Sequence, residues 1–192
     1  MKQLILASTS RYRKSLLEQL HWPFEALAPD VDESIYKEQL LAPQELAEKL
    51  SLLKAQDILD KNPQAVVIGS DQVCTYNGVI FSKPQNSDNA FNQLKMLSGH
   101  SHQLLTAVTI MSSEKTHTWT NTTTLTMRKL TDEDIKRYLA IDKPFDCAGS
   151  YKLESMGIKL FNKIEMSDHS AIIGLPLIDI TNVLISHFGF KF

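Results

Sequence analysis

The sequence predicts an α/β fold, because short apolar runs of strand length alternate with longer segments of helical spacing. Residues 4–7 and 65–68 are such runs, and each leads directly into a polar turn. Between them, residues 43–59 place leucines along one stripe of a helix that opens at a proline. The chain has 192 residues and no repeat, low-complexity tract or linker, so a single domain over residues 1–192 is expected.

The other elements continue this alternation along the chain. A helix over residues 14–20 should stop before Trp22 and Pro23, and a strand over 24–28 should lead into an acidic loop. The Asn77–Gly78 pair predicts a hairpin between short strands at 73–76 and 79–81. Further helices are expected over 87–97, 131–140 and 177–186, with strands over 103–111 and 116–127; the threonine-rich second strand suits an exposed edge.

Composition excludes several classes of protein. A net charge of −2 argues against a nucleic-acid polymer as partner, because such binding relies on many lysine and arginine contacts to phosphates. The two cysteines, Cys74 and Cys147, lack metal-site spacing, which favours a reduced compartment. No apolar run approaches the roughly 20 residues of a membrane span. A cytoplasmic location without membrane contact is therefore expected.

The turn after the first strand has the composition of a phosphate site. Ser8 and Ser10 bring hydroxyls, and Arg13 brings a planar guanidinium to the start of a helix, where the backbone dipole favours negative charge. The alternative is that the serines merely cap the helix and that the cations are solvated. This segment alone leaves both interpretations open.

Three carboxylates, Glu33, Asp71 and Asp146, are expected in loops, where α/β proteins usually place their sites. Such oxygen ligands suit Mg²⁺ or Mn²⁺ bound together with phosphate oxygens. For Asp146 a solvated surface charge is favoured. Asp71 is a stronger candidate, because a buried strand should deliver it to the site. Gly69 before it permits close backbone approach, and Gln72 after it can bind a polar ligand edge.

Lysines could contact the phosphates, although a lone lysine is usually a surface charge. The candidates are Lys54 on a helix flank and Lys83 before a proline at a strand exit. Nucleophilic catalysis lacks support: no serine elbow is present, and the histidines form no ligand spacing.

Short motifs along nearly the whole chain resemble those of the Maf nucleotide pyrophosphatases. The resemblance implies a mixed, twisted β-sheet flanked by helices, with two lobes around a nucleotide-binding cleft, in a Maf/ITPase-like fold. It also implies a cytoplasmic hydrolase that splits nucleoside triphosphates into monophosphate and pyrophosphate, and it indicates a homodimer. The matching segments are residues 6–10 with Arg13, 31–33, 54–55, 69–72, 83–84, 97–99, 106–108, 148–151 and 174–177.

Carried over residue by residue, the resemblance assigns catalytic roles. Asp71 would accept the proton of the attacking water, and Glu33 would help Asp71 to hold a divalent metal, Mg²⁺, Mn²⁺ or Co²⁺. The phosphates would be bound by the remaining motif residues, Ser8, Ser10, Arg13, Lys54 and Lys83. Metal and cations would neutralise the charge that develops on the pyrophosphate leaving group.

Three positions resemble the branch that hydrolyses 7-methyl-GTP: Tyr12, Gln72 and Glu154. Methylation at N7 leaves guanine positively charged, so Tyr12 could stack on the base and Glu154 could accept hydrogen bonds from its N1 and N2. The alternatives are a pyrophosphatase of the dTTP/UTP type and a non-catalytic, nucleotide-binding regulator of cell division.

Overall fold

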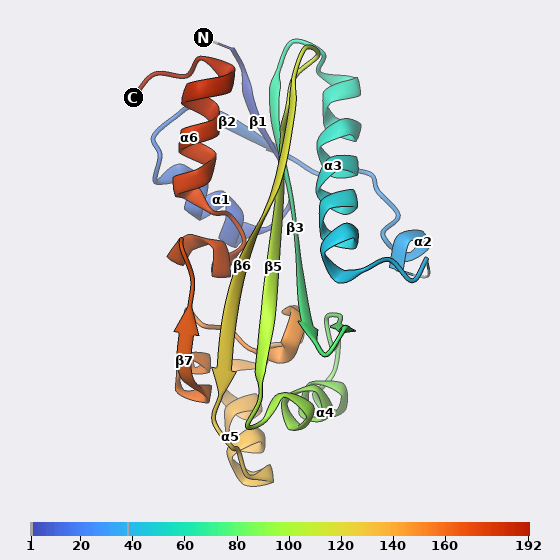
Figure 1. Ribbon diagram of the computed structural model, residues 1–192, viewed down its shortest axis with the longest axis vertical. Coiled ribbons are helices and arrows are strands. Elements are labelled where there is room, and N and C mark those ends of the chain that lie inside the picture. The colour runs from blue at the N-terminus through green and yellow to red at the C-terminus, as the bar shows by residue number, and fades with distance from the viewer. Residues whose placement is uncertain (1, 38) are drawn as a thin grey trace. The chain divides into compact units, whose positions relative to one another are not determined.

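The computed structural model describes residues 2–37 and 39–192, and within them the chain forms a mixed seven-stranded sheet flanked by helices (Figure 1). The strand order is β2-β1-β3-β5-β6-β7, and β4 pairs with β3. The strands are β1 (Leu4–Ala7), β2 (Phe24–Leu27), β3 (Val66–Tyr76), β4 (Val79–Phe81), β5 (Ser101–Met111), β6 (Thr116–Met127) and β7 (Phe161–Glu165). The α-helices are α1 (Arg11–Glu18), α2 (Ser34–Lys37), α3 (Pro43–Lys61), α4 (Ser87–Leu97), α5 (Asp132–Asp142) and α6 (Leu177–Phe188). Short 3₁₀ helices are η1 (Ala148–Ser150), η2 (Met156–Leu160) and η3 (His169–Ile173).

The chain divides into two compact units. The first unit contains the residues up to Gln72 together with Thr106–Asn121 and Asp168–Phe192, and the second contains Val73–Leu105 and Thr122–Ser167. Strands β3, β5 and β6 each begin in one unit and end in the other. The predicted mixed α/β fold is confirmed.

The first unit contains three parallel strands, and the central one, β1, is buried on both faces. Strand β1 lies between β2 and β3 and is parallel to both. Leu4 and Leu6 pack in a core with α1 and α6, whereas Ile5 and Ala7 pack in a second core with α3. Figure 1 shows α6 and α3 on opposite sides of these strands. This double cover explains why residues 4–7 are continuously apolar rather than alternating.

The register of these strands fixes where the site begins. Ala7 pairs with Gly69, so the turn that follows β1 lies beside Ser70 and Asp71 on β3. The sequence prediction had placed Gly69–Gln72 beyond the end of a strand, and this was wrong, because β3 continues without a break to Tyr76. Asp71 therefore projects from within a strand, which fixes its backbone more firmly than a loop would.

Gly69 allows α3 to lie directly against β3. A Cβ at this position would lie 2.2 Å from the Ser51 carbonyl oxygen and 2.8 Å from the Ala55 nitrogen. The backbone that approaches Gly69 is thus that of helix α3, which carries Lys54.

The second unit holds the predicted hairpin and two packed helices. Asn77 and Gly78 both have positive φ, as a two-residue hairpin turn requires, and Tyr76 pairs with Val79 across it. Leu94 of α4 and Leu139 of α5 are among the buried residues. Strand β7 was not predicted as a strand; it pairs with Thr124–Met127, so the expected edge character of β6 is wrong for that segment.

Among the residues that the structure describes, no helix has the length and apolar character needed to cross a membrane.

Candidate functional site

The turn after β1 is organised by its own serines. Ser10 is the N-cap of α1, and its Oγ accepts a hydrogen bond from the Arg13 backbone N–H at 3.4 Å. Ser8 is buried, and its Oγ accepts the Ser10 backbone N–H at 3.1 Å. The capping interpretation therefore holds for Ser10. The Ser8 hydroxyl proton and the first helical N–H groups remain suited to an anion.

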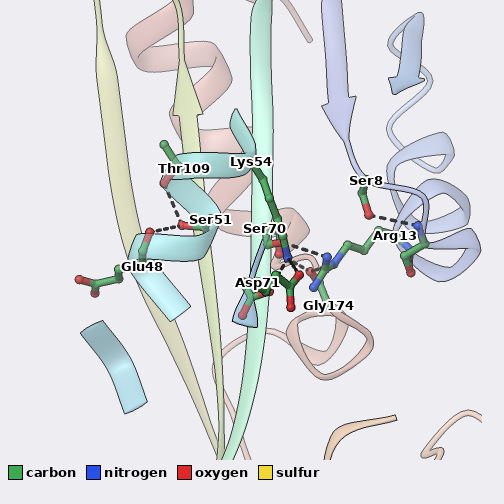
Figure 2. Close-up of polar contacts among 11 residues, drawn as sticks. Ser8, Arg13, Glu48, Ser51, Lys54, Ser70, Asp71, Thr109 and Gly174 are labelled. Carbon is green, nitrogen blue, oxygen red and sulfur yellow. Dashed lines mark hydrogen bonds and ion pairs between the residues drawn. The ribbon is translucent and has the colours of Figure 1, made fainter. Parts of the chain in front are cut away.

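Arg13 is held by two backbone carbonyls. Its Nη1 donates to the Ser70 carbonyl oxygen at 2.9 Å and its Nε to that of Gly174 at 3.2 Å, as Figure 2 shows. Burial lowers the pKa of Arg13, while the charges of Asp71 and Glu33 act to raise it. A guanidinium stays charged under such conditions, because its ordinary pKa is far above neutral. Arg13 is thus a fixed positive charge close to Asp71.

Lys54 joins the two carboxylates that the sequence singled out. Its Nζ lies 2.6 Å from Asp71 Oδ1 and 2.7 Å from Glu33 Oε1. The side chains of Lys54 and Asp71 are nearly buried, and that of Glu33 is 36% exposed. Burial raises the pKa of Asp71, and the charges of Lys54 and Arg13 oppose this shift. The structure brings Arg13, Glu33, Lys54 and Asp71 together in the first unit, and Figure 2 shows Arg13, Lys54 and Asp71.

The carboxylates of the site could hold a divalent cation only if a bound nucleotide supplied further oxygen ligands. Across residues 2–37 and 39–192, no group of three or more metal-ligating side chains gathers. Glu33 and Asp71 nevertheless converge on one positive charge, the Lys54 ammonium. Two carboxylates are enough for Mg²⁺ or Mn²⁺ when substrate phosphates supply further oxygens. The residues present therefore fit such an ion as part of a metal–nucleotide complex.

Gln72 is engaged mainly inside the protein. Its amide Nε2 lies 2.9 Å from Thr106 Oγ1 and 3.0 Å from the carbonyl oxygens of both Ala171 and Ile172. The amide nitrogen thus ties β3 to η3, and the Gln72 carbonyl oxygen is the part of the side chain suited to a ligand.

Tyr12 already carries a cation on its ring. The Arg11 guanidinium carbon lies 4.8 Å from the ring centroid, and Arg11 Nη2 donates to the Tyr12 hydroxyl at 2.9 Å. Arg11 is exposed and packs on this ring. The pair shows that the Tyr12 ring can accept a planar cation.

The remaining predicted residues belong to the second unit. Lys83 is exposed just after β4, and Glu154 is exposed in the turn between η1 and η2. Asp146 is also exposed and pairs with Lys152 at 3.1 Å, in keeping with its expected role as a surface charge. A cavity of about 620 Å³ in this unit lies between α4 and α5, and none of the predicted site residues lines it.

The sequence did not predict the hydrogen bonds that orient Arg13. The Ser70 hydroxyl donates to the Gly174 carbonyl oxygen at 2.9 Å, and this carbonyl also receives Arg13. Both residues lie in motifs that carried the family resemblance, but no local pattern reveals a contact between positions 104 residues apart.

The chain is similar over nearly its whole length to proteins of one family. The model of the family described as Maf-like protein matches residues 3–187, and the chain belongs to the Maf family. A protein of Bdellovibrio bacteriovorus named 7-methyl-GTP pyrophosphatase is 47% identical over 95% of this chain and 96% of its own length. A protein of the same name from Bordetella pertussis is 44% identical over 95% of this chain and 90% of its own. Among solved structures, the Staphylococcus aureus Ham1 protein is similar over 67% of this chain and 73% of its own, with 14% identity and a TM-score of 0.49.

Proposed function

We propose that this protein hydrolyses nucleoside triphosphates between the α- and β-phosphates, releasing monophosphate and pyrophosphate, and that 7-methyl-GTP is its preferred substrate. Relatives named 7-methyl-GTP pyrophosphatase are 40–47% identical to this protein over nearly its whole length. The observation that carries the reaction is the cluster of Arg13, Lys54, Glu33 and Asp71, because it combines a buried carboxylate with two cations.

Asp71 is the proposed proton acceptor. Burial raises its pKa, and a carboxylate with a raised pKa is a better base near neutral pH than a solvated one. Water would attack the α-phosphorus as its proton passes to Asp71, and the bond to the β-phosphate oxygen would break. Arg13 and Lys54, whose charges act on Asp71, would stabilise the phosphates in this step, with Lys83 and the Ser8 and Ser10 turn as further proposed contacts.

A divalent cation, Mg²⁺, Mn²⁺ or Co²⁺, is the proposed cofactor. Glu33 and Asp71 would hold it, and when bound it supplies additional positive charge to the phosphate oxygens. Lys54 bridges these carboxylates in the structure, so a metal held by the same two side chains would compete with its ammonium group.

Base selection is proposed to use Tyr12, Gln72 and Glu154. The Tyr12 ring carries the Arg11 guanidinium, and 7-methylguanine is likewise a planar cation that could stack on it. Glu154 would accept hydrogen bonds from the guanine N1 and N2 edge, and the Gln72 carbonyl oxygen offers a further acceptor. Turnover of 7-methyl-GTP should be compared with that of GTP, UTP and dTTP. Faster turnover of UTP or dTTP would replace this proposal with the pyrimidine-type activity.

Asp71→Asn tests the mechanism. Loss of the base should slow pyrophosphate release about 10²- to 10⁴-fold while nucleotide binding persists. Asp132→Asn is a suitable control, because Asp132 is also an ion-paired carboxylate, with Lys95 at 3.0 Å, but lies on α5 in the second unit. Unchanged release by Asp71→Asn would remove it from the mechanism. Binding without any release by the wild-type protein would favour the non-catalytic regulator.

The class of ligand, the cellular location and the oligomeric state are also proposals. Its ligand would be a free nucleotide rather than a nucleic-acid polymer, in keeping with a net charge of −2. We expect a cytoplasmic homodimer, and light scattering after size exclusion measures the oligomeric state directly.

A further inference from the structure

The carbonyl oxygen of Gly174 directs the guanidinium of Arg13. It receives Arg13 Nε at 3.2 Å and the Ser70 hydroxyl at 2.9 Å. Gly174 has a φ of +119°, and a Cβ there would lie 3.0 Å from Arg13 Nε. The guanidinium therefore packs against this turn, and its direction depends on where the turn places one carbonyl group.

A buried carboxylate fixes that turn at both ends. Asp168 is 2% exposed; its Oδ1 accepts both the backbone N–H and the hydroxyl of Ser170, and its Oδ2 accepts the Ile178 N–H at 2.8 Å. The Ser170 Oγ in turn accepts the Leu177 N–H at 2.8 Å. Asp168 and Ser170 thus bind the first turn of α6 to the start of η3, and Gly174 lies between the two attachments.

The middle of the same turn is attached to the sheet. The Ala171 carbonyl oxygen accepts the Thr106 hydroxyl at 2.9 Å and the Gln72 amide at 3.0 Å. It also accepts the Gly174 N–H at 3.0 Å. All of these residues belong to the first unit, so they form one continuous hydrogen-bonded support behind Arg13.

We infer that Asp168 and Ser170 are positioning residues of the proposed reaction, which act through the Gly174 carbonyl on Arg13. Two carbonyls use the Nε hydrogen and one Nη1 hydrogen, so the donors left for phosphate are the two Nη2 hydrogens and the second Nη1 hydrogen. Rotation of the guanidinium would misdirect these donors, and errors of about 1 Å in such groups can cost roughly 100-fold in rate. The inference rests on the proposed function for the identity of the substrate. The contacts that orient Arg13 are observed independently of that function.

A double-mutant cycle separates positioning from general stability. Asp168→Asn and Ser170→Ala are each made in the wild-type and in the Arg13→Lys background, where the lysine keeps the charge but replaces the separate Nε and Nη1 donors of the planar guanidinium with a single ammonium nitrogen. In the wild-type background, kcat/KM for 7-methyl-GTP should fall about 10-fold or more. In the Arg13→Lys background the same changes should cost little. Equal fold losses in both backgrounds would overturn the inference, because a merely structural role does not depend on Arg13.

Two further measurements keep the test decisive. Thermal unfolding checks that the variants are folded; if Asp168→Asn is not, the milder Ser170→Ala decides the cycle. Asp134→Asn is the control, since Asp134 also accepts a backbone N–H and a hydroxyl, both from Thr131, but caps α5 in the second unit. The cycle is repeated with the dissociation constant of pyrophosphate, which needs no turnover. If the substitutions weaken pyrophosphate binding only when Arg13 is present, and no variant or wild-type protein turns over nucleotide, the proposed function alone is refuted. If their effects on binding and on kcat/KM are the same in both backgrounds, the positioning role is refuted.

Discussion

Gly69→Ala should damage catalysis by moving a helix rather than by touching the substrate. The new Cβ would lie 2.2 Å from the Ser51 carbonyl oxygen and 2.9 Å from the Ala55 Cβ. Cβ atoms are essentially never found closer than 3.0 Å to such neighbours, so α3 must retreat from β3. A retreat of roughly 1 Å is of the size that costs about 100-fold in rate when it reaches a catalytic contact.

The displaced contact is the one between Lys54 and Asp71. Lys54 lies three residues after Ser51 on α3, and Asp71 lies two residues after Gly69 on β3. The Lys54 Nζ is 2.6 Å from Asp71 Oδ1. Overpacking of a close helix–strand contact costs about 1–3 kcal/mol. At about 2–4 °C per kcal/mol for a chain of this size, the melting temperature should fall by several degrees. We therefore expect kcat to fall about 100-fold in a protein that remains folded at 25 °C.

The assay is pyrophosphate release together with thermal unfolding, and Gly189→Ala is the matched control. Gly189 has a φ of +78°, and nothing lies within 4 Å of its Cβ position. Alanine there costs about 1–2 kcal/mol through backbone strain without a collision. The control should lose stability but keep its kcat. A Gly69→Ala enzyme with lowered melting temperature and wild-type kcat would refute the claim that α3 packing sets the position of Lys54.

Two other predictions concern buried titratable side chains, Lys54 and His102. Lys54→Met should lower kcat and yet strengthen binding of Mn²⁺ to the unliganded protein, because the ammonium between the two carboxylates no longer competes; weaker binding by calorimetry would contradict this. Burial lowers the pKa of His102 from 6.5 to about 4, so the unfolded chain binds more protons between these values and stability should fall as the pH drops through them. The loss reaches at most about 3 kcal/mol, and His102→Phe should flatten that part of the curve of melting temperature against pH.

Local patterns predicted the parts of the fold that depend on local physics. The apolar run at residues 4–7, the hairpin at Asn77–Gly78 and the helix that opens at Pro43 were all confirmed. The extent of β3 was not predicted, because Gly69–Gln72 is locally turn-like, and pairing with other strands makes it extended. Strand pairing between distant segments is invisible to a local window.

The candidate site divides in the same way. Asp71, Glu33, Lys54 and Arg13 could be named from residue type and motif, and the structure brings all four together. The contacts that orient Arg13 could not be named, because Arg13 and Gly174 are 161 residues apart. A backbone carbonyl has no residue-specific signal in the sequence, so the support behind a catalytic group is seen only in the fold.

The charges of the cluster lead to a prediction about the metal. Arg13 and Lys54 carry two positive charges and Glu33 and Asp71 two negative ones, so the cluster is neutral before a nucleotide binds. A triphosphate adds several negative charges to a nearly buried site, where unbalanced charge is costly. A chelator should therefore weaken nucleotide binding and abolish pyrophosphate release, and Mg²⁺, Mn²⁺ or Co²⁺ should restore both. Glu33→Gln makes the cluster positive, so it should bind nucleotide more tightly than wild type without metal but turn it over more slowly with metal. Weaker metal-free binding by Glu33→Gln would show that charge balance does not create the requirement for a divalent ion.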